Sequence, residues 1–176
     1  MTVSLVLNKI GSRKEDGLKL IVGMAKMEVS ADLSAQLVTY ALGSCLGIAV
    51  HDPIAGVGGL LHVMMPDSTI DAGRAEYNPS KFVDTGVPKL FRACYDLGAR
   101  KERMVLKVAG GASNKGADND FFQIGKRNFA MLRKLLWKND VLIAKAEVGG
   151  SDSRTMILDV GTGQVTVKIN GKEYVL

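Results

Sequence analysis

A cysteine beside small residues is the first feature of this sequence that could carry covalent chemistry. Cys45 directly follows Gly43 and Ser44, and another glycine, Gly47, comes two residues later. Small residues let a substrate approach the sulfur closely. They also leave backbone N–H groups free to face a developing oxyanion. A cysteine attacks as its thiolate, so this stretch predicts a nucleophile only if a base or a positive charge lies nearby.

The base that fits best is His62, which stands in the apolar run Leu60-Leu61-His62-Val63-Met64. Alternate residues of a strand share one face, so we expect His62 to lie on the same face as Leu60 and Met64. A polar ring on an apolar strand costs free energy unless it finds a partner. The sequence therefore predicts a specific partner for this imidazole.

A hairpin would bring the two groups together. Residues 46–51 and 57–64 are expected to be strands, because the turn-forming segment 53–56 separates two apolar runs. In such a hairpin Cys45, at the start of one strand, lies near His62, towards the end of the other. Thr39 precedes Cys45 by six residues, and its hydroxyl can hydrogen-bond to the imidazole and fix its tautomer, as the third member of a catalytic triad does.

The same residues also fit a purely structural interpretation. A lone cysteine in an apolar context is usually a buried small side chain, and a lone histidine on an apolar strand is usually a satisfied core residue. On spacing alone this interpretation is favoured over a nucleophilic pair of Cys45 and His62. Cys94 lies on the apolar face of an expected helix and is assigned to core packing. His51, which flanks a turn, is expected at the surface.

Two further stretches suggest weaker sites. The loop Gly110-Gly111-Ala112-Ser113 follows an expected strand but lacks the spacing and the Lys-Ser/Thr pair of a phosphate-binding loop. We interpret it as a tight loop that rims a site, with Gly110 and Gly111, like Gly43 and Ser44, as candidates for substrate positioning or the oxyanion. The basic residues of an expected helix over 125–138 indicate a solvated face, because no aromatic residues are interleaved as nucleic-acid binding would require.

Length and composition restrict the class of protein. The chain has 176 residues, of which 47% are hydrophobic and 23% charged, values typical of one globular domain. The 23 basic and 18 acidic residues give a net charge of +5, which permits an acidic partner but requires none. Two cysteines and two histidines argue against a disulfide framework and a structural zinc site. No transmembrane segment or signal peptide is evident, so a cytoplasmic location is expected.

The expected elements are mostly strands. Apolar runs with β-forming residues predict strands at 20–25, 36–42, 46–51, 57–64, 104–109, 141–148, 154–159, 164–169 and 173–176. Asn170-Gly171 is a strong hairpin signal between the last two. Helical spacing predicts two main helices, one containing residues 87–97 and one over 125–138, with Pro88 implying a kink or a later start in the first. We predict an α+β fold, a layered sandwich of mostly antiparallel sheet with two flanking helices. Residues 1–18 are expected to be a flexible lead-in, and 19–176 a single domain.

An ordered series of motifs also resembles the CheD family of chemoreceptor glutamine deamidases. It covers about residues 19–170 and is quite specific as a series. The motifs that carry it are Thr39 with Leu42-Gly43-Ser44-Cys45, Asp52-Pro53, the run His62 to Ser68, Tyr77 with Asp84-Thr85, Ala109-Gly110-Gly111-Ala112, Ile124-Gly125-Lys126-Arg127-Asn128 and Gly149-Gly150.

The resemblance implies an activity and a mechanism. It makes Cys45 the nucleophile, His62 the general base and acid, and Thr39 the residue that orients His62, which reverses the preference from spacing alone. The implied reaction converts receptor glutamine side chains to glutamate with release of ammonia and no cofactor or metal, and the same chemistry would hydrolyse receptor methyl esters. The implied partner is the cytoplasmic coiled coil of a methyl-accepting chemoreceptor, without nucleic acid or membrane insertion.

The resemblance has departures and an alternative. The family often carries a glycine just before the arginine that follows Gly149-Gly150, where this sequence has Ser153, and the loop 113–122 and residues 1–18 are unfamiliar. These differences bear on partner choice more than on chemistry. The alternative is a non-enzymatic binding module for the phosphatase CheC. A cysteine peptidase is disfavoured by the short chain and the missing Asn or Asp partner motif.

Overall fold

The structure is a computed structural model that describes residues 17–113 and 123–176. Most of the predicted lead-in, and most of the unfamiliar loop 113–122, therefore lie outside the described residues. Leu18, the last residue of that lead-in, accepts a hydrogen bond on its carbonyl from the backbone N–H of Gln36 at 2.8 Å. The first described residues thus already belong to the edge of a sheet.

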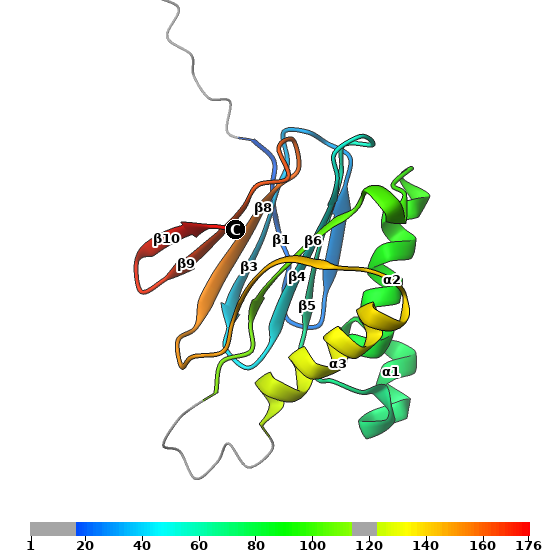
Figure 1. Cartoon of the computed structure of the whole chain (residues 1–176), viewed down its shortest axis with the longest axis vertical. Helices are drawn as coiled ribbons and strands as arrows, with labels where there is room; N and C mark the ends of the chain where they lie inside the picture. The colour runs from blue at the N-terminus through cyan, green and yellow to red at the C-terminus, as the bar shows by residue number, and fades with distance from the viewer. Residues whose placement is uncertain (1–16, 114–122) are drawn as a thin grey trace, which may run out of the picture.

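The described residues form two five-stranded sheets, which we call the outer and the central sheet (Figure 1). The outer sheet has the order β1-β3-β8-β9-β10. Its strands are β1 (Lys19–Ile21), β3 (Gln36–Leu42), β8 (Arg154–Asp159), β9 (Val165–Ile169) and β10 (Lys172–Val175). Only β1 and β3 run parallel. The Asn170-Gly171 turn joins β9 to β10 with positive φ at both residues, as a type I′ hairpin turn requires, so this predicted hairpin is confirmed.

The central sheet has the order β2-β5-β4-β6-β7. Its strands are β2 (Met27–Ser30), β4 (Leu46–Asp52), β5 (Val57–Val63), β6 (Val105–Gly110) and β7 (Ile143–Val148). The predicted hairpin of β4 and β5 is confirmed, with Asp52 paired to Val57 at its turn and Leu46 paired to Val63 at its open end. Only β6 and β7 run parallel in this sheet, so the sandwich is mostly antiparallel, as predicted.

Helices cover the face of the central sheet that points away from the outer sheet (Figure 1). Within the described ranges the α-helices are α1 (Ala72–Tyr77), α2 (Val83–Asp96) and α3 (Ile124–Lys138), and the 3-10 helices are η1 (Ser68–Asp71), η2 (Pro79–Lys81) and η3 (Lys101–Arg103). One apolar core fills the space between the central sheet and α2 and α3, and a second fills the space between the two sheets. This three-layer arrangement confirms the predicted α+β class with two main helices.

Alternation along β4 and β5 sends side chains into different layers. Leu46 and Ile48 of β4 pack towards the helices, whereas Ala49 packs between the sheets. On β5, Leu61 faces the helices, and Leu60 faces the outer sheet. Because residues two apart share a face, His62 lies in the layer between the sheets, on the face of Leu60, as predicted.

The structure corrects three local expectations. The strand expected over 20–25 ends at Ile21, and a separate strand, β2, follows a turn in which Ala25 has a φ of 54°. The short helix α1 was not predicted. The first main helix, α2, begins at Val83 and runs through Pro88, so the alternative of a later start is wrong.

Candidate functional site

Thr39 lies in the layer between the sheets because it shares a face of β3 with Leu37, and β3 changes register just beyond it. Thr39 pairs with Met156 of β8, but the next ladder pair joins Leu42 to Arg154, so β3 contains a bulge. Ala41 in this bulge has a φ of 56°, a left-handed conformation that side chains seldom adopt. The extra residue of the bulge returns Leu42 to the face of Thr39, and both side chains are fully buried. Gly43 and Ser44 then lead the chain to β4.

Thr39 and His62 form the central contact of the site. Thr39 Oγ1 lies 2.8 Å from Nδ1 of His62 and donates its own proton to the backbone carbonyl of Val22 at 2.7 Å. A hydroxyl has one proton, and Val22 receives it, so Oγ1 must accept from an Nδ1–H of the imidazole. The neutral ring then carries no proton on Nε2. The geometry therefore selects the tautomer whose Nε2 lone pair can accept a proton.

The Nε2 atom of His62 is buried and has no hydrogen-bond partner within residues 17–113 and 123–176. Burial lowers the pKa of His62 to about 4, so the ring is neutral at physiological pH. An unpaired buried nitrogen costs free energy. Such a group is a candidate for proton transfer, since its lone pair is neither used by the fold nor solvated.

Cys45 lies on the same face as His62, one position beyond the β4–β5 ladder. His62 pairs with Gly47, and Leu46 pairs with Val63, so the register continues with Cys45 opposite Met64. Cys45 and His62 are thus diagonal neighbours on one face of the hairpin, a separation that side chains can bridge. Cys45 is half-buried and packs against the core between the sheets, whereas Ser44 before it is exposed.

Burial raises the pKa of the Cys45 thiol, and its own backbone N–H partly offsets this effect. The thiol is therefore protonated at physiological pH, and its neighbour His62 is neutral. Within the described residues, no backbone carbonyl accepts from the N–H groups of Ser44 and Cys45, and the N–H of Cys45 faces only its own sulfur. These two amides at the edge of the site are available to an oxyanion.

The glycine loop after β6 supports the cysteine from the other side. The backbone N–H of Gly111 donates to the carbonyl of Cys45, and that of Ala112 donates to the carbonyl of Gly43, both at 2.8 Å. Gly110 has a φ of 115°, and a side chain there would collide with the Cys45 carbonyl. Gly110 and Gly111 therefore let β6 approach the backbone of Cys45, and their N–H and C=O groups hold the loops in place.

The structure adds Asn128 of α3 to the site, a residue that the sequence analysis quoted in a family motif without giving it a role. Its side chain is fully buried, and Nδ2 donates to the backbone carbonyls of Ser44 at 3.0 Å and Met64 at 3.1 Å. The available signal was a polar residue on the apolar face of the helix, three residues after Gly125 and four before Leu132.

The remaining predicted positions have structural roles. Cys94 lies buried in α2, with burial raising its pKa to about 12, so its assignment to the core is confirmed. The expectation that His51 lies at the surface is wrong. Its ring is 7% exposed and packs against Gly163, and Nε2 lies 2.9 Å from the carbonyl of Val160. The β8–β9 turn of the outer sheet covers this ring.

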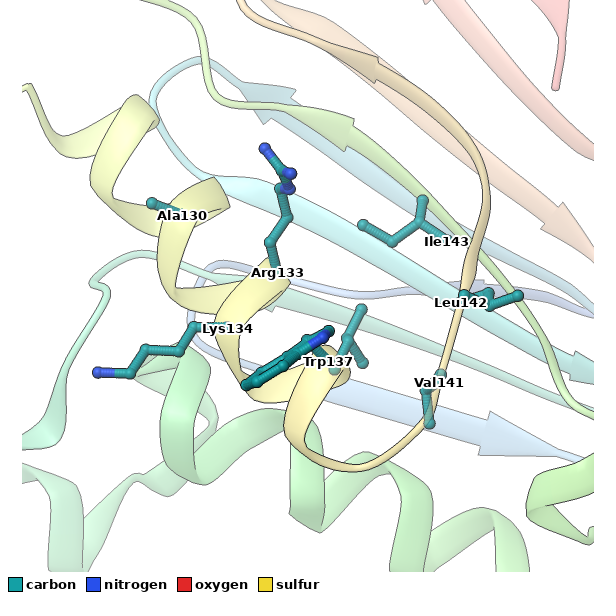
Figure 2. Close-up of a pocket in the computed structure, with 8 residues that line it drawn as sticks. Ala130, Arg133, Lys134, Trp137, Val141, Leu142 and Ile143 are labelled. Carbon is teal, nitrogen blue, oxygen red and sulfur yellow. The ribbon is translucent and has the colours of Figure 1, made fainter.

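A separate groove of about 620 Å³ lies between the C-terminal half of α3 and the segment leading into β7 (Figure 2). Its rim carries the exposed side chains of Trp137 and Leu142 together with the basic residues Arg133 and Lys134. None of the predicted site residues lines this groove. The exposure of Arg133 and Lys134 agrees with the solvated basic face expected for this helix.

Comparison with known proteins identifies the family. A family model described as CheD chemotactic sensory transduction matches residues 64–169. A probable chemoreceptor glutamine deamidase CheD 1 of Syntrophus aciditrophicus is 50% identical over 152 residues, covering 86% of this chain and 94% of the relative. The chain belongs to the CheD family. Two more CheD relatives agree: the protein of Solibacter usitatus is 46% identical (88% of this chain, 91% of the relative), and that of Desulforamulus reducens is 41% identical (85% and 90%).

Membership of the CheD family does not by itself assign the site. The family match begins at residue 64, after Thr39, Cys45 and His62, so their roles rest on the geometry described above. A crystal structure of a Neisseria meningitidis protein of the DUF152 family covers 76% of this chain and 63% of its own, with a TM-score of 0.44 and 10% identity, a likeness too distant to support an argument. Within the described residues, no helix has the length and apolar character needed to span a bilayer.

Proposed function

We propose that this CheD family member is a chemoreceptor glutamine deamidase that uses Cys45, His62 and Thr39 as its catalytic group. The observation that carries the proposal is the pair of hydrogen bonds at Thr39, which leaves Nε2 of a neutral His62 without a proton on the face of the hairpin that carries Cys45. The names of the relatives, which are 41–50% identical, supply the substrate class.

In the proposed reaction, Cys45 Sγ attacks the carboxamide carbon of a receptor glutamine while the thiol proton moves to Nε2 of His62. The tetrahedral oxyanion accepts hydrogen bonds from the backbone amides of Ser44 and Cys45. His62 then donates its proton to the leaving ammonia, and a thioester remains. Water, deprotonated by His62, attacks the thioester; the C–S bond breaks, His62 returns the proton to the Cys45 sulfur, and glutamate is released. Every step uses groups of the chain and water, so the mechanism includes no metal or cofactor.

The position of the site suits a glutamine on a folded helix. Cys45 is half-buried and follows the exposed Ser44 at the start of β4, at an end of the sandwich. A long glutamine side chain can reach such a position while its own helix stays intact. Receptor methyl esters have the same acyl carbon at similar reach, and we include their hydrolysis as a second reaction through the same thioester. Because these side chains lie on the receptor's cytoplasmic coiled coil, the proposed location is the cytoplasm.

The test is to incubate the full chain with a receptor cytoplasmic fragment and follow conversion of glutamine to glutamate by peptide mass spectrometry. We expect Cys45→Ala to abolish conversion and Cys94→Ala to retain it, because Cys94 lies in the core beneath α2. Each variant loses one cysteine sulfur from the same protein, so the two are matched controls. Equal conversion by the wild type and Cys45→Ala would overturn the proposed nucleophile.

Binding of the phosphatase CheC stays a prediction of the sequence resemblance. Titration of CheC with Cys45→Ala separates binding from turnover. Saturable binding by this variant, together with no conversion of any receptor by the wild type, would favour the binding-module alternative over the enzyme.

A further inference from the structure

Asn128 holds together the end of the hairpin on which Cys45 and His62 meet. The β4–β5 ladder ends at the pair Leu46 and Val63. Beyond it, the carbonyls of Ser44 and Met64 both accept from Nδ2 of Asn128. These carbonyls belong to the residue just before Cys45 and the residue opposite it in the continued register. The last contact across the open end is therefore a side chain of α3 and not a strand hydrogen bond.

We propose that Asn128 is a positioning residue that sets the approach of the Cys45 sulfur to Nε2 of His62. The inference rests on the proposed function, because it assigns Asn128 a role in the proton transfer between these two groups. Asn128 does not touch the reacting atoms in this scheme. It acts through the backbone of the two strands that carry them.

The hydrogen-bond pattern fixes the orientation of the amide. Nδ2 has two protons, and the carbonyls of Ser44 and Met64 take both. A flipped amide would place Oδ1 against two carbonyl oxygens, which repel it. In the observed orientation Oδ1 is buried without a partner among the described residues. An unpaired buried oxygen costs free energy. Asn128 therefore fixes the positions of the two strand carbonyls while lowering the stability of the folded protein.

The helix α3, which carries Asn128, also packs closely against the glycine loop that supports Cys45. Gly125 approaches the loop so closely that an added Cβ would lie 2.5 Å from the Gly111 carbonyl oxygen. Gly111 in turn donates its N–H to the carbonyl of Cys45. Gly125, Asn128 and Leu132 share the buried face of α3. A shift of this face would therefore move both supports of Cys45 at once.

The test uses alkylation of Cys45 by iodoacetamide at pH 7, with the Cys45 and Cys94 peptides quantified separately by mass spectrometry. In this reaction the S–C bond forms as the C–I bond breaks, iodide leaves, and the thiol proton passes to His62. His62→Gln gives the rate of Cys45 alkylation when the base is absent. Asn128→Leu keeps a similar volume and removes both hydrogen bonds. Leu132→Ala is the matched control, because it weakens the same helix face one turn away without touching either strand carbonyl.

We expect Asn128→Leu to slow alkylation of Cys45 at least about tenfold, towards the rate of His62→Gln, since a positioned base contributes two or more orders of magnitude. Leu132→Ala should stay within about twofold of the wild type when both are folded. With a receptor substrate, Asn128→Leu should lower kcat by the same factor as alkylation and leave KM unchanged, because Asn128 does not contact substrate. A structural role alone would lower the melting temperature without this selective change.

Several results would overturn the inference. A folded Asn128→Leu that alkylates like the wild type would do so, and so would equal rates for the wild type and His62→Gln. If Asn128→Leu does not fold, Asn128→Asp decides: its carboxyl donates one hydrogen bond when protonated and none when ionised. Its alkylation rate relative to the wild type should therefore fall as pH rises, and a constant ratio would contradict the proposal. Failure of both variants to fold would assign Asn128 to stability alone. An inactive wild type on receptors would instead refute the proposed function, since the alkylation comparison needs no receptor.

Discussion

Substituting Thr39 by valine is the sharpest single perturbation of the site. Valine has nearly the shape of threonine, so the packing between the sheets is kept while the hydroxyl is lost. The change removes the acceptor of the Nδ1–H of His62 and the donor to the Val22 carbonyl. It therefore tests whether the tautomer selected by Thr39 matters to the reaction, separately from whether a histidine is present.

The expected magnitude follows from the cost of leaving a buried donor unpaired. With valine at position 39, neither neutral tautomer of His62 has an acceptor for its N–H among the described residues, so the preference for the Nδ1–H tautomer is lost. The imidazolium that forms when His62 takes the thiol proton also loses its acceptor at Nδ1, and a hydrogen bond to a charged group contributes about 1.5–3 kcal/mol. At about 1.4 kcal/mol for each factor of ten, kcat falls about 10- to 150-fold. KM should change little, because Thr39 is fully buried and does not reach the substrate.

The assay is the initial rate of glutamine deamidation in a receptor fragment at saturating substrate, well below the melting temperature of each variant. Thr39→Ser is the matched control, since it keeps the hydroxyl, and we expect it to retain most of the activity. Wild-type kcat for a folded Thr39→Val would refute the tautomer argument. An equal loss in Thr39→Ser and Thr39→Val would show that the side-chain methyl, and not the hydroxyl, is what the site requires.

Three further outcomes are expected. His62 has its pKa lowered to about 4 by burial, so the folded state resists protonation and stability should fall as pH decreases from about 6.5 towards 4; thermal melts of His62→Gln should lack this component, and an unchanged slope would contradict it. Burial raises the pKa of the Asp52 carboxyl, but Arg103 and backbone N–H groups have the larger opposite effect, so its pKa lies below the usual range. Asp52→Asn should therefore lower the free energy of unfolding by about 2–4 kcal/mol at pH 7, and by progressively less below pH 4, as measured by chemical denaturation. A loss of stability that does not depend on pH would refute the ion pair. Gly110→Ala should slow deamidation by displacing the Cys45 carbonyl, and a wild-type rate would show that β6 can move away without consequence.

Local signals in the sequence were sufficient for the hairpin that carries the site. The turn over 53–56 and the alternation along β5 predict which face His62 occupies, and the β4–β5 register agrees. The strand β2 was missed because its four residues show no clear pattern of their own. It forms because β5 offers an edge, with Met27 paired to Leu61. The helix α1 was missed because its six residues contain a glycine and bury none of their side chains.

Predictions about burial and long-range contacts were less successful. His51 resembles a turn-flanking surface residue in the sequence, but the β8–β9 turn, more than 100 residues later, packs over it. Asn128 contacts carbonyls 84 and 64 residues away, and no local pattern specifies such partners. The pairing of Thr39 with His62 could be proposed because β3, which carries Thr39, directly precedes the β4–β5 hairpin in the chain. The bulge at Ala41, just beyond Thr39, has no clear sequence signal.

The electrostatics of the site distinguish this arrangement from one that holds a preformed thiolate and imidazolium. Burial shifts both pKa values towards the neutral forms, raising that of Cys45 and lowering that of His62. A separated charge pair at rest would need solvent or a counter-charge to stabilise it, and Nε2 of His62 has neither within the described residues. Charge therefore develops only as the sulfur attacks, when the amides of Ser44 and Cys45 can stabilise the oxyanion. A thiol that passes its proton to His62 only as it attacks is less reactive at rest than a preformed thiolate. This property suits a half-buried cysteine that solvent can still reach.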